Sequence, residues 1–109
     1  MNEMIYERLK SIACLQQTVT YAEIGLLADL DMNNPADRNR IGIILGEIST
    51  FEHQHGRPLL SVLVIHSHNN IPGDGFFNLS RELNVYHGDD DCMFFNQELD
   101  RVYEYWRNI

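Results

Sequence analysis

Residues 18–49, "TVTYAEIGLLADLDMNNPADRNRIGIILGEIS", carry two consecutive helix-start signals. Thr20 is followed three residues later by Glu23, which is the capping-box pattern, because each of the two side chains then accepts a hydrogen bond from a backbone N–H of the first turn. Asn34 and Pro35 form the second signal, since asparagine caps helices and proline suits their first position. The stretch therefore predicts two helices joined by a turn, and the second helix carries an apolar stripe of Ile41, Ile44, Leu45 and Ile48.

The flanking segments extend this pattern in both directions. Residues 3–16 have the apolar spacing of an amphipathic helix. Gly56 is a C-terminal stop for the helix that begins near Asn34. The run "RPLLSVLVI", residues 57–65, is aliphatic and short, which predicts a buried strand. After a loop at 66–75, Phe76 and Phe77 are predicted as the returning strand, and a last helix is predicted over about 92–107.

The order of these elements predicts the fold class. Three N-terminal helices, a β-hairpin and a C-terminal helix, with a proline-marked turn before the third helix, are typical of a winged helix-turn-helix. A chain of 109 residues is long enough for one modest core. We therefore predict an α+β, winged-helix-like fold in a single domain, residues 1–109.

The charge balance separates the function classes. Eight basic residues stand against 16 acidic ones, a net charge of −8, and Lys10 is the single lysine. Such a domain repels nucleic acid at long range, and arginine favours bidentate, partly buried contacts over loose phosphate attraction. The balance disfavours a general DNA binder and favours a protein partner, particularly a basic one.

The sequence also bears on the cellular location of the protein and on the state of its two cysteines. No apolar run approaches the roughly 18 residues that span a bilayer, and the N-terminus lacks the pattern of a signal peptide. We expect a cytoplasmic protein without membrane contact. Cys14 and Cys92 lie in predicted helices, and we interpret them as free thiols packed in the core. A disulfide between them stays open, because distance along the chain does not fix distance in space.

Five residues of the helix-turn-helix stretch carry a resemblance to a known family. Tyr21 and Ile24, then Ile41, Gly42 and Leu45, match a Tyr-x-x-Ile-Ala helix start and an Ala-Arg-x-Val-Gly-x-x-Leu recognition helix. This pattern resembles the DNA-binding domain of the alkyltransferase-like proteins, which recognise alkylated guanine, over about residues 18–77. The resemblance implies a winged helix with DNA as ligand.

Two departures limit what the resemblance implies. Asn39 stands where the family has its intercalating arginine, with Arg38 and Arg40 beside it. Residues 60–63 stand where the family has Pro-Cys-His-Arg, so the resemblance implies no alkyl transfer. Residues 57–77 also look like small uncharacterised bacterial proteins that have a Gly-Arg-Pro-Leu-Leu-Ser run ahead of Pro-Gly-x-Gly-Phe-Phe. That second resemblance implies a bacterial source and no particular activity.

The histidines raise the question of a metal site. His66 and His68 are two apart, so on an extended strand they share one face. His53 and His55 lie near the end of the preceding helix, and the fold brings all four together if the strand returns beside that helix. Neutral imidazoles bind zinc or copper, yet no Cys-x-x-Cys spacing accompanies them. We expect no metal and no cofactor.

A hydrolytic triad can be drawn from Ser61 or Ser67, a histidine of the loop and Asp74. The chain lacks the Gly-x-Ser-x-Gly elbow that holds such a nucleophile, so we expect no enzyme and no catalytic residues. The carboxylates Glu47 and Glu52 are five apart on a helix, and we interpret them as a solvated face together with Arg57.

The leading hypothesis is a non-catalytic, acidic binding module, an immunity- or antitoxin-like inhibitor of a basic protein. One of Phe76 and Phe77 is expected to face away from the core, because neighbours on a strand point to opposite faces. The candidate binding residues are Arg38, Arg40, Arg57, His66, His68, Asp74 and Phe76. Two alternatives stay open: a winged-helix DNA binder that uses Arg38, Arg40 and the 66–75 wing, and a small metal protein or enzyme built on the His-rich loop. The oligomeric state is undetermined.

Overall fold

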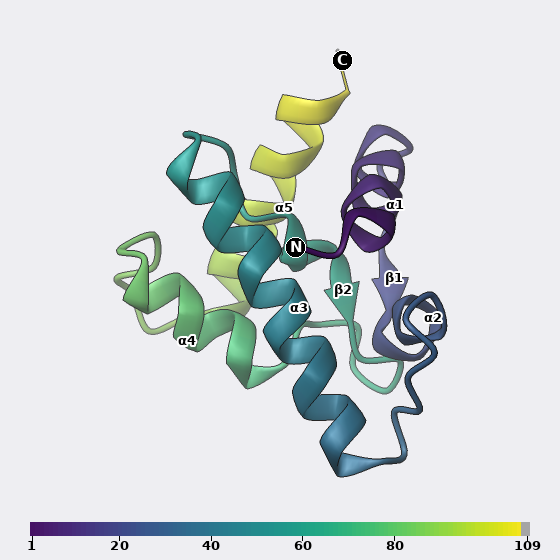
Figure 1. Cartoon of the computed structure of the whole chain (residues 1–109). Helices are drawn as coiled ribbons and strands as arrows, with labels where there is room; N and C mark the ends of the chain where they lie inside the picture. The colour runs from purple at the N-terminus through teal and green to yellow at the C-terminus, as the bar shows by residue number, and fades with distance from the viewer. Residues whose placement is uncertain (108–109) are drawn as a thin grey trace.

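The computed structural model describes residues 1–107 of the chain (Figure 1). They form an α+β fold with five α-helices, one 3-10 helix (η1) and two short strands. In chain order the elements are α1 Glu3–Cys14, β1 Val19–Thr20, α2 Tyr21–Leu26, α3 Pro35–Gln54, η1 Leu60–Leu63, β2 Val64–Ile65, α4 Asp74–Glu82 and α5 Asp91–Trp106.

The predicted helix starts are confirmed. The Thr20 hydroxyl accepts from the Glu23 backbone N–H, and the Glu23 carboxylate accepts from the Thr20 N–H, so the capping box of α2 is complete. The Asn34 side chain accepts from the backbone N–H groups of Ala36 and Asp37, with Pro35 in the first turn of α3. Gly56, just after α3, has a φ of +72°, a left-handed conformation that glycine adopts readily.

The predicted β-hairpin is wrong. Only Val64 and Ile65 of the 57–65 run form a strand, and they pair with Val19 and Thr20 in parallel. Residues 60–63 turn instead into the 3-10 helix η1. The physical reason is that an apolar run without a period is buried on every side, and it can be so whether it is extended or coiled.

Phe76 and Phe77 are also not a strand. They lie in the first turn of helix α4, and both side chains are buried. The expectation that one of them faces away from the core is therefore wrong. In a helix, adjacent residues are only about 100° apart, so both rings can enter one aromatic cluster with Tyr86 and Phe94.

The core is centred on η1, which packs against α1, α3 and α5 (Figure 1). Leu60, Val62 and Leu63 have no exposed surface. Helix α4 lies beside the middle of α3, on the side away from α1. One face of the long helix α3 therefore contacts η1. Helix α4 covers only part of the outer face of α3.

Two buried carboxylates anchor the core. Glu52 is fully buried, and it accepts from the Tyr6 hydroxyl at 2.6 Å and from Arg57 Nε at 2.7 Å. The predicted solvated face of Glu47, Glu52 and Arg57 is therefore wrong for Glu52, although Glu47 is exposed. Glu98 is likewise buried and accepts from the Leu59 backbone N–H at 2.8 Å and from Arg101. Both charges are paired with arginine, as buried charges must be.

The two cysteines are free, as predicted, but they are not packed in the core. Cys14 and Cys92 are both exposed. Cys14 is near the end of α1, where its thiol lies 3.3 Å from the Trp106 carbonyl oxygen, and Cys92 is in the first turn of α5. Within residues 1–107, no helix combines the length and the apolar character needed to cross a membrane.

Candidate binding groove between α3 and α4

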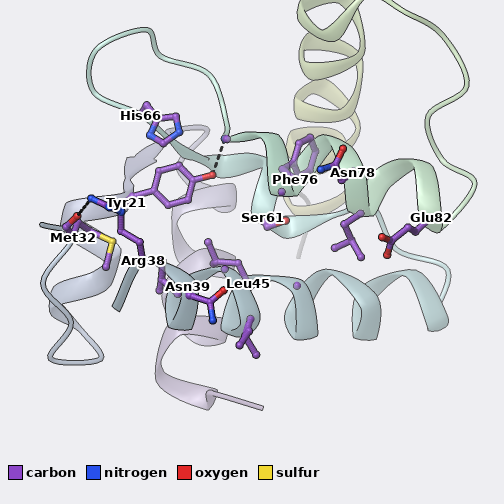
Figure 2. A pocket seen from close by; sticks show the side chains of 17 residues that line it. Tyr21, Met32, Arg38, Asn39, Leu45, Ser61, His66, Phe76, Asn78 and Glu82 are labelled. Carbon is purple, nitrogen blue, oxygen red and sulfur yellow. Dashed lines mark hydrogen bonds between the residues drawn. The ribbon is translucent and has the colours of Figure 1, made fainter. Parts of the chain in front are cut away.

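A groove of about 650 Å³ runs between α3 and α4, and we call it the α3–α4 groove (Figure 2). Helix α3 contributes Arg38, Asn39, Ile41, Gly42, Ile43, Leu45 and Gly46. Helix α4 contributes Gly75, Phe76, Asn78, Leu79 and Glu82. The end near α2 is closed by Tyr21, Met32, His66 and Gly73. Its volume lies in the range of about 300–1,000 Å³ that is typical of ligand pockets.

The floor of the groove is apolar apart from one hydroxyl. Ile41, Leu45 and Phe76 are buried side chains of this floor. Ser61 lies among them with 4% of its surface exposed, and its hydroxyl is 2.6 Å from that of Ser49. The Ser61 backbone N–H donates to the same Ser49 oxygen at 3.0 Å. The floor thus presents one buried polar atom whose position is fixed by a neighbour.

A hydrogen bond joins the start of α2 to the start of α4. The Gly73 backbone N–H donates to the Tyr21 hydroxyl oxygen at 2.8 Å, the dashed line at Tyr21 in Figure 2. Burial raises the pKa of the Tyr21 hydroxyl, and the hydrogen bond from Gly73 partly offsets this rise. A Cβ at Gly73 would lie 3.0 Å from His66 Nε2, so only glycine lets the three groups meet without a shift.

His66 lies beside Tyr21 at this end of the groove, and its ring packs against two others. Its ring centroid is 4.6 Å from that of Tyr21 and 5.1 Å from that of His68. Burial and the neighbouring His68 lower the pKa of His66, while Asp74 raises it by less. The net lowering favours the neutral imidazole at neutral pH, which is the form that stacks without charge repulsion.

The rim of the groove is polar. Arg38 extends along the rim and donates from Nη1 to the Met32 carbonyl oxygen at 3.2 Å. Asn39 on α3 and Asn78 and Glu82 on α4 lie farther along the opening (Figure 2). An apolar floor with a polar rim is the composition of a binding site, in which the rim sets orientation and the floor supplies most of the affinity.

The predicted site residues separate into two groups. Arg38, His66 and Phe76 line the groove, and His68 and Asp74 adjoin it through His66. Arg40 is exposed on α3 and does not line the groove, whereas Arg57 is held by Glu52 after the other end of α3.

Three observations on the described part of the chain bear on the alternative chemistry of the His-rich loop. The Ser61 hydroxyl lies 2.6 Å from that of Ser49, and among residues 1–107 no side-chain hydrogen bond joins Ser61 to a histidine. His55 is engaged with the Phe51 carbonyl oxygen through Nδ1 at 2.8 Å, at the end of α3. Among residues 1–107, no group of three or more histidine, cysteine or acidic side chains is placed to hold a metal ion.

Several groove residues do not stand out as site residues in the sequence. Tyr21 carries only the signal of a helix start, whereas Ser61 stands out as a candidate nucleophile and not as part of a groove floor. The glycines of the two walls, Gly42 and Gly46 on α3 and Gly73 and Gly75 at the start of α4, carry no signal of chemistry at all. The available signal is the spacing of Gly42 and Gly46, because residues four apart on a helix share one face. Comparison of the chain with protein-family models, curated proteins and solved structures found no match.

Proposed function

We propose that this protein is a non-catalytic binding module that holds a segment of a basic protein in the α3–α4 groove. The observation that carries the proposal is the groove itself, with its apolar floor and polar rim beside an uncovered face of α3. A groove between two helices suits an amphipathic helix that inserts apolar residues at positions i, i+3 or i+4, and i+7. An immunity- or antitoxin-like inhibitor of a basic toxin or nuclease is the relationship that fits a small acidic chain.

The distribution of charge supports a basic partner. Four of the eight basic side chains, Lys10, Arg57, Arg101 and Arg107, are already paired with carboxylates of the same chain. Apart from Glu52 and Glu98, the acidic side chains are partly or fully exposed. The surface therefore carries more negative than positive charge, which speeds the encounter with a positively charged partner.

A selection experiment tests the proposal even while the partner is unidentified. A phage library of helical peptides is selected on the wild-type protein alone, and the enriched peptides are then tested for binding to Gly42→Leu. A Cβ at Gly42 meets no atom within 4 Å, so leucine there points into the groove and leaves the core intact. Gly88→Leu is the matched control, because Gly88 lies in the turn before α5, away from the groove.

We expect enriched peptides to carry apolar residues at helical spacing on one face and Lys or Arg on the other. They should bind wild type and Gly88→Leu alike and bind Gly42→Leu poorly. A selection that enriches no helical pattern would contradict the proposal. Enriched peptides that bind Gly42→Leu as well as they bind the wild type would also contradict it.

DNA binding is the second candidate, and the state of two arginines favours it. Arg38 and Arg40 are exposed near the start of α3, and within residues 1–107 neither forms an ion pair with a carboxylate. In this hypothesis α2 and α3 form the helix-turn-helix of a winged-helix-like fold, with the loop after β2 as the wing. The resemblance to alkyltransferase-like proteins supports the same hypothesis.

Fluorescence anisotropy with a labelled duplex at rising salt tests this candidate. If it holds, Arg38→Ala and Arg40→Ala should each weaken binding and reduce the slope of log affinity against log salt by about one. A duplex that does not bind even at low salt eliminates the candidate.

A further inference from the structure

The end of the groove near α2 differs from the rest in its chemistry, and we call it the aromatic end. It consists of Tyr21, His66, Phe76 and the two glycines Gly73 and Gly75. The opposite end passes Gly46 and Leu79 into a second hollow of about 340 Å³ next to Phe51. A partner helix along α3 would therefore meet one end walled by rings and another lined mostly by aliphatic and polar side chains.

The rings of the aromatic end are held in place before anything binds. Tyr21 is fixed at its hydroxyl by Gly73 and at its ring by His66. Phe76 is buried between Phe77 and Phe94, with ring centroids 5.3 Å and 5.9 Å away. Rings that are already fixed lose little conformational freedom on binding, so more of the contact energy appears as affinity.

Each of the two walls has one position without a side chain that opens directly onto free space. A Cβ built at Gly42 on α3, or at Gly75 on α4, would meet no atom within 4 Å. Helix interiors normally avoid glycine, which destabilises them by about 1 kcal/mol relative to alanine. Here the glycines keep both sides of the groove open, so that a flat group can lie close to the backbone.

The polar atoms are few and specific. Ser61 offers one buried hydroxyl in the floor, and the Tyr21 hydroxyl accepts from Gly73 and keeps its own proton to donate. An indole or a phenol has a large apolar body and one polar atom, which matches an apolar floor with only these two hydroxyl groups. A nucleobase has several donors and acceptors on its edge, and an apolar floor leaves most of them unpaired at a cost.

We infer that the aromatic end binds one aromatic anchor residue, tryptophan or tyrosine, on the helix of the basic partner. This inference rests on the proposed function and names the side chain that dominates the contact. Tryptophan and tyrosine are enriched among the residues that contribute most to binding. Asp74, the exposed residue between Gly73 and Gly75 beside this end, favours Lys or Arg next to the anchor.

Titration of ¹⁵N-labelled protein with indole, followed by amide chemical shifts, tests the inference directly. The seven glycines of the chain provide both the readout and the control. Gly42, Gly73 and Gly75 should shift with a common dissociation constant, whereas Gly56 and Gly88 should not. Tyr21→Phe removes one hydroxyl and should weaken indole binding about threefold to tenfold, while Gly75→Leu should abolish it and Gly88→Leu should leave it unchanged.

Adenine is titrated in parallel to separate the two chemistries. Shifts with adenine and none with indole overturn the inference in favour of a nucleobase. Absence of shifts with both compounds overturns it as well. If helical peptides are enriched on the groove but contain neither tryptophan nor tyrosine, the anchor is wrong while the proposed function stands; failure of the selection contradicts the proposed function itself.

Discussion

Glu52 is a single residue that joins two distant parts of the chain, α1 and the end of α3. Its carboxylate accepts from Tyr6 on α1 and from Arg57 after α3, and none of its surface is exposed. The burial and the pairing of such a carboxylate are decided by its neighbours in space and not by its spacing in the sequence. The sequence pattern groups Glu52 with Glu47 because both lie on one helix, and it does not show that Tyr6 faces only one of them.

Replacement of Glu52 tests this network. Glu52→Ala should lower the free energy of unfolding by about 3–5 kcal/mol, because a buried acceptor is lost and Arg57 and Tyr6 are left unpaired. Glu47→Ala, on the exposed side of the same helix, should change it by no more than about 0.5 kcal/mol. Urea unfolding followed by circular dichroism measures both. Equal effects of the two substitutions would show that the Glu52 network does not stabilise the fold.

Tyr6 predicts how stability depends on alkaline pH. Burial and the hydrogen bond to Glu52 raise the pKa of Tyr6 from 10.0 to about 12. Because the folded pKa is higher than the unfolded pKa, the stabilisation is fully present below pH 10 and is lost as the pH rises toward 12. The free energy of unfolding should fall over this window, and that of Tyr6→Phe should fall less steeply. An identical slope for both proteins would contradict the assignment.

The cysteines give a simple chemical test of their exposure. Because Cys14 and Cys92 are exposed and free, both thiols of the native protein should react with a disulfide reagent without denaturant. Absorbance of the released thiolate should report two equivalents, and Cys92→Ser should reduce this to one. Thiols that react only after unfolding would restore the core-packed interpretation.

At the scale of elements, the helix starts are predictable from the sequence and the apolar run after α3 is not. Caps are local signals, because Thr20 with Glu23 and Asn34 with Pro35 satisfy backbone groups within a few residues. The 57–65 run has no period, so its pattern does not distinguish a strand from the 3-10 helix that forms at 60–63. The partner strand at 19–20 is only two residues long and carries only the signal of a helix cap.

The first turn of helix α4 escapes sequence-based prediction for a related reason. Pro72, Gly73 and Gly75 are typical turn residues, so the pattern predicts a strand at Phe76 and Phe77 after a turn. The spacing of Phe76, Phe77 and Ser80 is the helical signal that the sequence does contain, and all three are buried. Tertiary contacts with Tyr86 and Phe94 decide the conformation, and these lie beyond a short sequence window.

The cap of α3 makes a quantitative prediction for an element. Asn34→Ala should lower the free energy of unfolding by about 1 kcal/mol, because the N–H groups of Ala36 and Asp37 lose their acceptor. Asn33→Ala is the neighbouring control, since the Asn33 side chain does not cap the helix. Thermal unfolding compares the two. If Asn33→Ala costs as much as Asn34→Ala, capping is not the source of the effect.

For the whole molecule, the groove depends on contacts that no local pattern contains. Tyr21 and Gly73 are 52 residues apart, yet their hydrogen bond closes one end of the site. The sequence suggests Arg38, His66 and Phe76 as binding residues by their chemistry, and the structure brings them to one groove, with Phe76 buried in a helix and not on a strand. The glycines are not predictable, because their role is to leave space, and that role becomes visible only when two helices are placed side by side.

The charge of the whole molecule predicts the kinetics of binding. Raising the salt concentration from about 50 to about 500 mM should slow association of a basic groove-binding peptide at least roughly tenfold and change its dissociation rate far less, because long-range steering is screened while groove contacts are not. Surface plasmon resonance separates the two rates. An association rate independent of salt would remove the role proposed for the acidic surface.

The dissociation constant of the best enriched helical peptide, measured by calorimetry for the wild type, Gly42→Leu and Gly88→Leu, is the sharpest test of the groove as the binding site. We predict binding to Gly42→Leu that is weaker by about tenfold or more, which is a loss of about 1.4 kcal/mol, and unchanged binding to Gly88→Leu. Equal affinity for all three proteins would place the contact elsewhere and contradict the proposed function.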